Sequence, residues 1–150
     1  MTISALLSPQ RIFLDVEISS KKKLLELIAN IVADQTRLAE SSIYNKLLTR
    51  ERLGSTGLGQ GFAVPHARLE NLDQTMGCFF RLKYPVNFEA PDNQPVDLLF
   101  TIIIPEEATE EHLIILSSLA SIFSQAEVCA AIRGATSRDE IAQIIKSAEQ

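Results

Sequence analysis

The residues best suited to chemistry lie between Arg50 and Arg68, where a histidine follows a run of glycines. Four of the six glycines fall within eight residues, at positions 54, 57, 59 and 61. Glycines at this density let backbone N–H groups approach a ligand closely and form a concave anion site. The glycine count alone fits a flexible turn between a helix and a strand as well as it fits an anion site.

The glycine run matches neither of the common nucleotide-binding motifs. Gly59 is followed by Gln60, where a mononucleotide-binding loop requires Gly-Lys-Ser/Thr. Gly57, Gly59 and Gly61 also have the wrong spacing for the dinucleotide fingerprint. We therefore expect neither ATP nor NAD at this loop, and no cofactor elsewhere.

His66 favours a catalytic interpretation of the segment. A lone histidine is more often a surface or satisfied core residue, but this one follows Pro65, which restricts the backbone, and closes a loop suited to anions. A neutral imidazole nitrogen is a nucleophile near neutral pH without a general base. Arg50, Arg52 and Arg68 are near enough in sequence to bind a phosphoryl group bidentately.

The second histidine, His112, falls at the predicted start of a helix. Free N–H groups at a helix start favour anions, so His112 is a candidate for the same site. An exposed histidine in a first helical turn fits the sequence as well. The two cysteines, Cys78 and Cys129, form no CxxC or Cys/His cluster, so we expect two small buried residues rather than a zinc site or a disulfide.

Length and charge exclude several classes of protein. The 150 residues suit a single domain spanning 1–150, and 14 basic against 19 acidic side chains give a net charge of -5. A chain of this charge has little to offer a nucleic acid backbone. The longest apolar run, Leu98–Ile104, is far below the ~20 residues that span a bilayer, and the N-terminus lacks a signal-peptide pattern. We expect a soluble, cytoplasmic protein without membrane insertion.

The first half of the chain predicts one strand followed by two helices. Alternating apolar residues predict a strand over Ile12–Ile18, and Ser20 can cap the helix that follows. Lys21–Lys23 are interpreted as a solvated start of that helix. A second helix is expected over Ser41–Leu53, ended by Gly54 in the left-handed conformation. In the strand expected over Ile12–Ile18, one face would carry Ile12, Leu14, Val16 and Ile18.

Several strands are expected next. Phe62–Val64 is expected to be extended, and Val86–Phe88 to form a short flanking strand. Val96–Ile104 is apolar almost throughout, which predicts a central strand buried on both faces. Thr75–Leu82 alternates, with one face made of Met76, Cys78, Phe80 and Leu82.

Three helices complete the pattern. The first begins near Glu110, the second covers Glu127–Arg133 and ends at Gly134, and the third begins at a capping box of Ser137 and Glu140. Helices on both faces hide a central strand best, so the predicted class is α/β, a three-layer α/β/α sandwich with a mixed central sheet. The inward stripe of the first helix would be Leu113, Leu116, Leu119, Ala120 and Phe123.

The segment Thr49–His66 resembles the phosphorylation-site signature of the enzyme IIA proteins of the bacterial phosphotransferase system, mannitol/fructose type. It contains Gly-Ser-Thr-Gly-Leu-Gly-Gln-Gly-Phe-Ala-Val-Pro-His. Residues 92–105, followed by Glu111-His112-Leu113, look like the nitrogen-regulatory branch of that family. The resemblance covers nearly the whole chain. One departure is Ala67, where the family often has glycine after the histidine.

This resemblance implies a phosphocarrier with a mixed sheet between helical layers. It makes His66 the phosphoacceptor, through Nε2 with Nδ1–H held by a backbone carbonyl, and gives Arg50 and His112 active-site roles. The donor would be the phosphohistidine of an HPr-like carrier, NPr in the nitrogen branch. A donor already phosphorylated on nitrogen requires neither ATP nor Mg²⁺.

Two further sets of residues are expected at such a site. A donor must dock on an apolar surface around the histidine, for which we expect Leu58, Phe62 and Leu69. Equatorial oxygens of the phosphoryl group need stabilisation. Besides Arg50, the candidates for that role are Ser55, Thr56, Gly57, Gly59 and Gly61.

Three alternatives to a nitrogen-regulatory phosphocarrier stay open. A sugar-specific enzyme IIA would pass the phosphoryl group to a permease domain, and the lack of a fused permease in these residues favours the regulator. A binding module that is never phosphorylated would use the same surface. A hydrolase is the weakest alternative, because no Ser/Asp/His arrangement of recognisable spacing is present.

Overall fold

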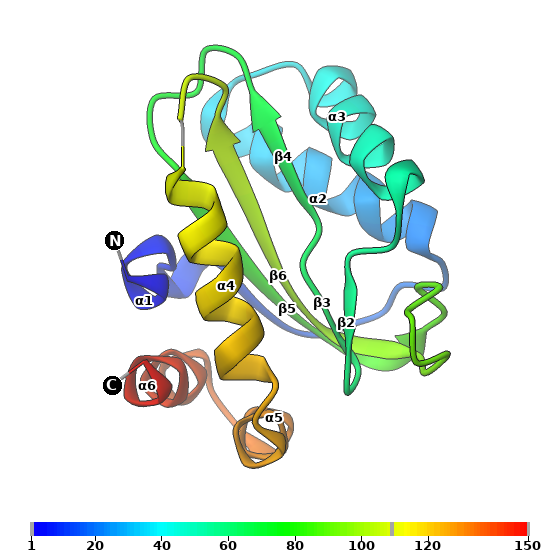
Figure 1. Cartoon of the computed structure of the whole chain (residues 1–150), viewed down its shortest axis with the longest axis vertical. Helices are drawn as coiled ribbons and strands as arrows, with labels where there is room; N and C mark the ends of the chain where they lie inside the picture. The colour runs from blue at the N-terminus through cyan, green and yellow to red at the C-terminus, as the bar shows by residue number, and fades with distance from the viewer. Residues whose placement is uncertain (1, 109, 150) are drawn as a thin grey trace.

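The computed structural model describes residues 2–108 and 110–149 (Figure 1). The described residues form a mixed α/β fold with a six-stranded sheet. Its elements, in chain order, are α1 (Ile3–Leu6), the 3₁₀ helix η1 (Pro9–Arg11), β1 (Ile12–Val16), α2 (Lys21–Thr36), α3 (Glu40–Leu53), β2 (Gly57–Gly59), β3 (Phe62–Ala63), β4 (His66–Leu69), β5 (Met76–Val86), β6 (Val96–Pro105), α4 (Glu111–Phe123), α5 (Ala126–Gly134) and α6 (Arg138–Ala148).

The sheet is mixed and has the order β1-β5-β6-β3-β2. β5 and β6 are antiparallel, and β1 runs parallel to β5. β3 and β4 both pair with the other edge of β6, in parallel and one after the other. β2 folds back on β3 as an antiparallel hairpin.

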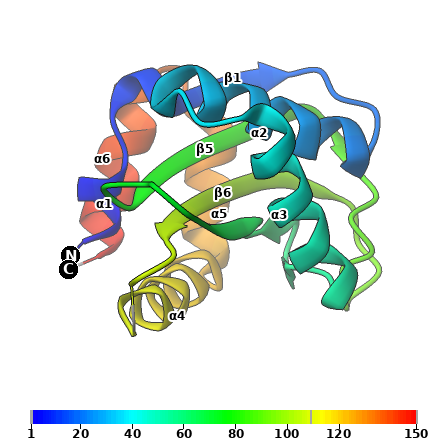
Figure 2. The same cartoon turned by 90° about the horizontal axis from the view of Figure 1, so that it is seen from above.

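Helices cover both faces of the sheet (Figures 1 and 2). One buried cluster packs α2 and α3 against one face, and a second packs α1, α4, α5 and α6 against the other. The predicted three-layer α/β/α arrangement is therefore confirmed. The central position of β6 is confirmed too, since its apolar residues divide between the two clusters.

β5 confirms one predicted face and corrects one predicted boundary. Met76, Cys78, Phe80 and Leu82 all pack in the cluster beneath α2 and α3. The strand continues to Val86, which pairs with Val96, so the separate strand expected over Val86–Phe88 is wrong.

The prediction that β1 has a single apolar face is wrong. Asp15 adopts a φ of 53°, and the pairing with β5 shifts register between Phe13 and Val16. Such a bulge turns the residues that follow to the opposite face. Leu14 accordingly packs towards α4–α6, whereas Val16 packs towards α2 and α3.

The inward stripe expected for α4 is only partly correct. Leu119 and Phe123 are buried as predicted, but Leu113 and Ala120 are exposed. Ile115 and Ile122 occupy the core instead. Because the helix is apolar on nearly all sides, hydrophobic spacing did not determine which side faces the sheet.

Side-chain caps begin two of the helices as predicted. Ser20 accepts a hydrogen bond from the backbone N–H of Lys23 at the start of α2, and Ser137 accepts one from Glu140 at the start of α6. Gly54 ends α3, but with φ 156° and ψ 145° it lies outside the left-handed helical region that was predicted.

The two ends of the described chain are joined. The carboxylate of Glu149 accepts hydrogen bonds from the backbone N–H groups of Ile3 (2.5 Å) and Ser4 (2.8 Å), and Figure 2 shows the termini side by side. Among the described helices, none is by itself long and apolar enough to cross a bilayer. α4 and α5 reach that length and hydropathy only when taken together, and they meet at 80°.

Candidate functional site

His66 is the first residue of β4, directly after a break in the edge of the sheet. β3 ends at Ala63, and Val64 and Pro65 separate it from β4. The chain stays next to β6 across this break, because Pro65 accepts a hydrogen bond from the N–H of Ile102 (3.1 Å). Pro65 has no N–H to add to the ladder, which favours an interruption here. The break leaves the carbonyl of Val64 available to the side chain of His66.

The imidazole of His66 is held through one nitrogen. Its Nδ1 lies 2.8 Å from the carbonyl oxygen of Val64. A carbonyl only accepts hydrogen bonds, so Nδ1 carries the proton in this contact. In the neutral ring Nε2 then presents its lone pair. This is the ring orientation that the family resemblance implies.

The surroundings of His66 favour that neutral ring. Burial has the largest effect and lowers the pKa of His66 from its ordinary 6.5. The hydrogen bond to Val64 opposes this by raising the pKa, and the charge of Glu51 also raises it. The positive charge of Arg50 and the nearby His112 lower the pKa. His66 is therefore neutral at physiological pH, with the charged side chains of Arg50 and Glu51 on α3 close to it.

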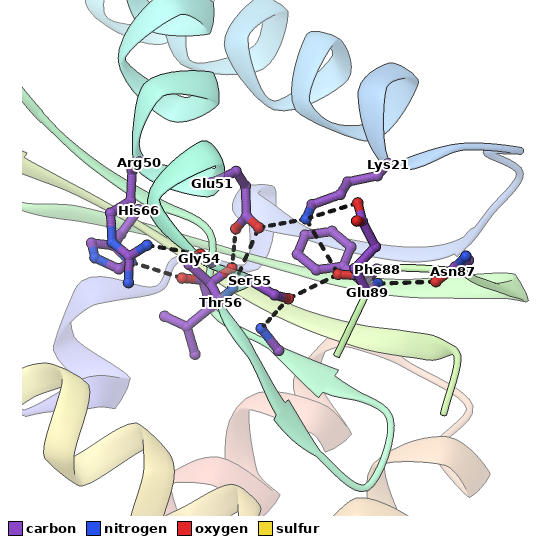
Figure 3. A network of polar contacts seen from close by, with 12 residues as sticks. Lys21, Arg50, Glu51, Gly54, Ser55, Thr56, His66, Asn87, Phe88 and Glu89 are labelled. Atoms are coloured by element: carbon purple, nitrogen blue, oxygen red, sulfur yellow. Dashed lines mark hydrogen bonds and ion pairs between the residues drawn. The ribbon is translucent and has the colours of Figure 1, made fainter. Parts of the chain in front are cut away.

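Arg50 approaches the site from the last turn of α3. Figure 3 shows its guanidinium beside the ring of His66, and Nη1 donates to the carbonyl of Gly54 (2.9 Å). Its remaining N–H groups are suited to an anion on Nε2 of His66. The structure thus brings Arg50 to the histidine, as the sequence predicted.

His112 lies in the first turn of α4 and is held by Arg68. Nη2 of Arg68 is 2.8 Å from Nδ1 of His112 and 3.1 Å from its Nε2. Nη1 of the same guanidinium donates to the carbonyls of Glu106 (3.1 Å) and Ala108 (2.6 Å). Arg68 therefore joins β4 to the segment that leads into α4. From its position in the sequence, Arg68 was expected only to bind a phosphoryl group.

A buried carboxylate, that of Glu51, also lies near the site and was not among the residues expected from the sequence. Glu51 is 6% exposed, and it accepts hydrogen bonds from the hydroxyl and the N–H of Thr56. Lys21 pairs with it at 2.7 Å (Figure 3). Lys21 was expected to be solvated, but its ammonium packs over the ring of Phe88 at 4.5 Å. In the sequence, the one indication of this role was that Glu51 follows Arg50 directly and lies just before the glycine run.

The hydroxyl groups expected to bind phosphate already have protein partners. Thr56 is 4% exposed and donates to Glu51. Ser55 donates to the carbonyl of Phe88 (2.8 Å) and accepts from the N–H of Gly57 (3.1 Å). The prediction that these groups bind phosphate is therefore wrong for Thr56, and the structure gives Ser55 and Gly57 a role in the turn.

Gly59 and Gly61 lie away from His66, on the turn of the β2–β3 hairpin. β3 begins opposite Leu98 of β6 and β4 begins opposite Ile102, a separation of about 13 Å along a strand. Positive φ angles of 96° and 78° explain why glycine occupies both positions. Gly59 and Gly61, which were expected to help bind the phosphoryl group, therefore form the turn of a β-hairpin instead.

Two of the three expected docking residues are buried. Phe62 is 1% exposed and stacks on Phe123, and Leu69 is 3% exposed in the core beneath α3, so neither can meet a partner. Leu58 is exposed as expected. Three more large apolar side chains are exposed on the elements that carry Arg50 and His112. We define these with Leu58 as the apolar rim: Leu53, Leu58, Leu113 and Ile114.

No group of histidine, cysteine, aspartate and glutamate residues in the described ranges has the arrangement of a metal site. The site offers instead one nucleophilic nitrogen, a guanidinium and a second imidazole. These groups suit transfer of an anionic group to Nε2 of His66.

Comparison with known proteins agrees with this chemistry. Residues 5–148 match the family described as "Phosphoenolpyruvate-dependent sugar phosphotransferase system, EIIA 2". The chain is 42% identical over 135 residues to the nitrogen regulatory protein of Escherichia coli (strain K12), which covers 89% of this chain and 83% of that protein. It is 32% identical over 146 residues to the fructose-specific EIIABC component of the Bacillus subtilis (strain 168) phosphotransferase system, covering 97% of this chain and 23% of that protein.

A solved structure shows the same relationship. The nitrogen regulatory protein IIA-Ntr from Neisseria meningitidis matches with a TM-score of 0.91 at 41% identity, covering 95% of this chain and 98% of that one. The chain therefore belongs to the EIIA 2 family of the phosphoenolpyruvate-dependent sugar phosphotransferase system, and within that family it resembles the nitrogen regulatory proteins.

Proposed function

We propose that this chain is a phosphocarrier that accepts a phosphoryl group on Nε2 of His66. The donor is the phosphohistidine of an HPr-like carrier, NPr in the nitrogen branch, and the phosphorylation state of His66 regulates other proteins. The observation that carries the proposal is the 2.8 Å contact between Nδ1 of His66 and the carbonyl of Val64, which leaves Nε2 as the nucleophile.

The reaction exchanges one nitrogen–phosphorus bond for another. The lone pair on Nε2 of His66 forms the new bond to phosphorus, and the donor nitrogen leaves with the electrons of the old one. The ring of His66 gains positive charge as this happens. The carbonyl of Val64 stabilises that charge through Nδ1–H, and the carboxylate of Glu51 adds to the effect.

Charge on the transferred group also needs stabilisation, because phosphoryl transfer depends mainly on alignment and on neutralising the equatorial oxygens. Arg50 supplies a guanidinium beside His66. His112 supplies an imidazole N–H near the start of α4, where the helix amides favour negative charge. With Thr56 and the hairpin glycines excluded, these two side chains carry most of this role.

The donor docks on the apolar rim. Leu53 is 81% exposed at the end of α3, and Ile114 is 64% exposed in the first turns of α4. Large apolar side chains in such positions are typical of interaction surfaces. Leu53, Leu113 and Ile114 of the rim lie at the two helix ends that carry Arg50 and His112, so a bound carrier would cover the reacting atoms.

Reconstitution tests this function. The purified chain is incubated with phosphoenolpyruvate, enzyme I and either an HPr-type or an NPr-type carrier, and its intact mass is measured before and after acid treatment. We expect the mass of one acid-labile phosphoryl group, absent from His66→Ala. An unmodified wild-type chain would leave only a binding module.

The sugar-specific alternative is supported by the similarity to the fructose-specific EIIABC component of Bacillus subtilis. That alternative predicts onward transfer, which the same assay can measure. After removal of the donor, a fructose-type permease IIB domain is added to the phosphorylated chain. Retention of phosphate on this chain favours the regulator, and transfer to the IIB domain favours the sugar-specific carrier.

A further inference from the structure

A chain of hydrogen bonds runs from the surface of α2 to His66 (Figure 3). Lys21 binds Glu51 at 2.7 Å, and Glu51 accepts both the hydroxyl and the N–H of Thr56, the latter at 3.3 Å. These contacts fix Thr56, at the base of the β2–β3 hairpin, to the end of α3.

The backbone of Thr56 continues the chain to the histidine. Its carbonyl accepts a hydrogen bond from the N–H of Val64 at 3.0 Å. The carbonyl of Val64 in turn accepts the Nδ1–H of His66 at 2.8 Å. The peptide groups on either side of Val64 are thus bound at one end to Thr56 and at the other to the reactive ring.

Burying the carboxylate of Glu51 at this position costs free energy of folding. A buried carboxylate loses its hydration, and that loss is offset only when hydrogen bonds and an opposite charge replace it. Lys21 provides the charge, although a lysine in the first turn of α2 opposes the helix dipole. Fully bonded polar groups of this kind hold one arrangement of the chain against alternatives.

We propose that Glu51 is a positioning residue, which acts through Thr56 to fix the Val64 carbonyl that orients His66, while Lys21 balances its charge. The inference rests on the proposed function of His66. Glu51 and Thr56 do not contact the phosphoryl group in this account. They set the direction in which Nε2 points.

The first test replaces only the hydroxyl. Thr56→Val keeps the shape of the side chain and removes its bond to Glu51, whereas Thr56→Ser retains the hydroxyl. Thr101→Val is the matched control, because Thr101 is a buried threonine of β6 whose hydroxyl has no partner among the described residues. We expect Thr56→Val to lower the rate constant of transfer into His66 by about 10- to 100-fold, with little change in the KM for the donor. Thr56→Ser retains most of that rate, and Thr101→Val leaves it unchanged.

The orientation of the ring is measured separately, by the ¹⁵N chemical shifts of the His66 side chain without any donor. In the wild type we expect Nδ1 to be the protonated nitrogen, and in Thr56→Val a mixture of the two tautomers. Unchanged shifts together with a wild-type transfer rate would overturn the proposal. A slow Thr56→Val with unchanged shifts would also overturn it, since the loss would then not act through the ring.

The role of Lys21 is read from a double-mutant cycle with Glu51→Gln and Lys21→Met. If Lys21 acts only through Glu51, the double variant transfers no more slowly than Glu51→Gln alone. Additive losses would contradict this part of the proposal. If Thr56→Val fails to fold, Glu51→Gln supplies the same pair of readouts. Failure of wild-type phosphorylation would refute the proposed function of His66, whereas the ring shifts report on Glu51 independently of it.

Discussion

Arg68 and His112 are in direct contact, with Nη2 of Arg68 lying 2.8 Å from Nδ1 of the imidazole. A guanidinium has no acceptor, so a ring nitrogen that binds it does so through a lone pair. Arg68 stands two residues after His66 on the same strand. One short segment of β4 therefore contains the proposed phosphoacceptor and the side chain that contacts the second imidazole.

Replacing Arg68 tests that contact. Lysine keeps the charge but lacks the planar guanidinium fork whose two nitrogens contact His112 and two carbonyl groups. We expect Arg68→Lys to slow phosphoryl transfer by about tenfold, less than the ~10²–10³ that loss of a direct transition-state donor costs. In a His112→Ala background the same change should have no further effect. Additive losses would show that Arg68 acts independently of His112. Arg138→Lys, an exposed change on α6, is the control.

Arg50 should affect the rate and leave stability nearly intact. Its guanidinium makes one described backbone contact, to Gly54, at an exposed position, so little stability depends on it. Arg50→Gln removes the charge beside His66 and should lower the single-turnover rate by about 10²-fold. Single-turnover kinetics and thermal melts measure the two effects. A wild-type rate would remove Arg50 from the site.

The pH dependence follows from the lowered pKa of His66. Since burial lowers that pKa below 6.5, Nε2 stays unprotonated as the pH falls to 6.5, and transfer should decline only below that value. Stability changes in the same range. Below pH 6.5 His66 binds a proton in the unfolded chain but not yet in the folded chain, whose pKa is lower. The contribution of neutral His66 to the free energy of unfolding is therefore complete above pH 6.5 and is lost as the pH falls through the folded pKa.

Two measurements check this: a pH–rate profile for transfer into His66, and the denaturation midpoint against pH for the wild type and His66→Gln. The variant should lose less stability in acid. A rate that already falls above pH 6.5 would mean that the pKa of His66 is raised.

The apolar rim should determine the affinity for the donor. Leu53→Ser and Ile114→Ser remove exposed apolar area without disturbing the core, so we expect a higher KM for the phosphorylated carrier and an unchanged kcat. Tyr84→Ser is the control, because Tyr84 is also exposed but lies on β5, outside the apolar rim. Equal KM values for all three variants and the wild type would place the docking surface elsewhere.

The sequence was most informative where local patterns were strong. Ser20 and Ser137 predicted two helix starts, and the apolar run of β6 predicted the centre of the sheet. It was misleading where a long-range contact decided the outcome. Phe62 and Leu69 were expected to dock a partner because they flank His66 in sequence, but Phe62 stacks on Phe123 of α4 and Leu69 packs in the core beneath α3.

The site shows the same limit. His66, Arg50 and His112 were found from residue type and family resemblance, which need no three-dimensional information. Glu51 was missed because a carboxylate gains its role only from its partners, and those come from α2 and from the base of the hairpin. Pairings of that kind leave no periodic pattern in the sequence.

The most direct test of the account is to locate the phosphoryl group on the phosphorylated wild-type chain. Selective ¹⁵N labelling of histidine side chains, with ¹⁵N–³¹P coupling measured by NMR, distinguishes the two nitrogens of each of the two histidines. The account predicts coupling at Nε2 of His66 alone, with Nδ1 still protonated against the carbonyl of Val64. Coupling at Nδ1 of His66, or at either nitrogen of His112, would contradict it.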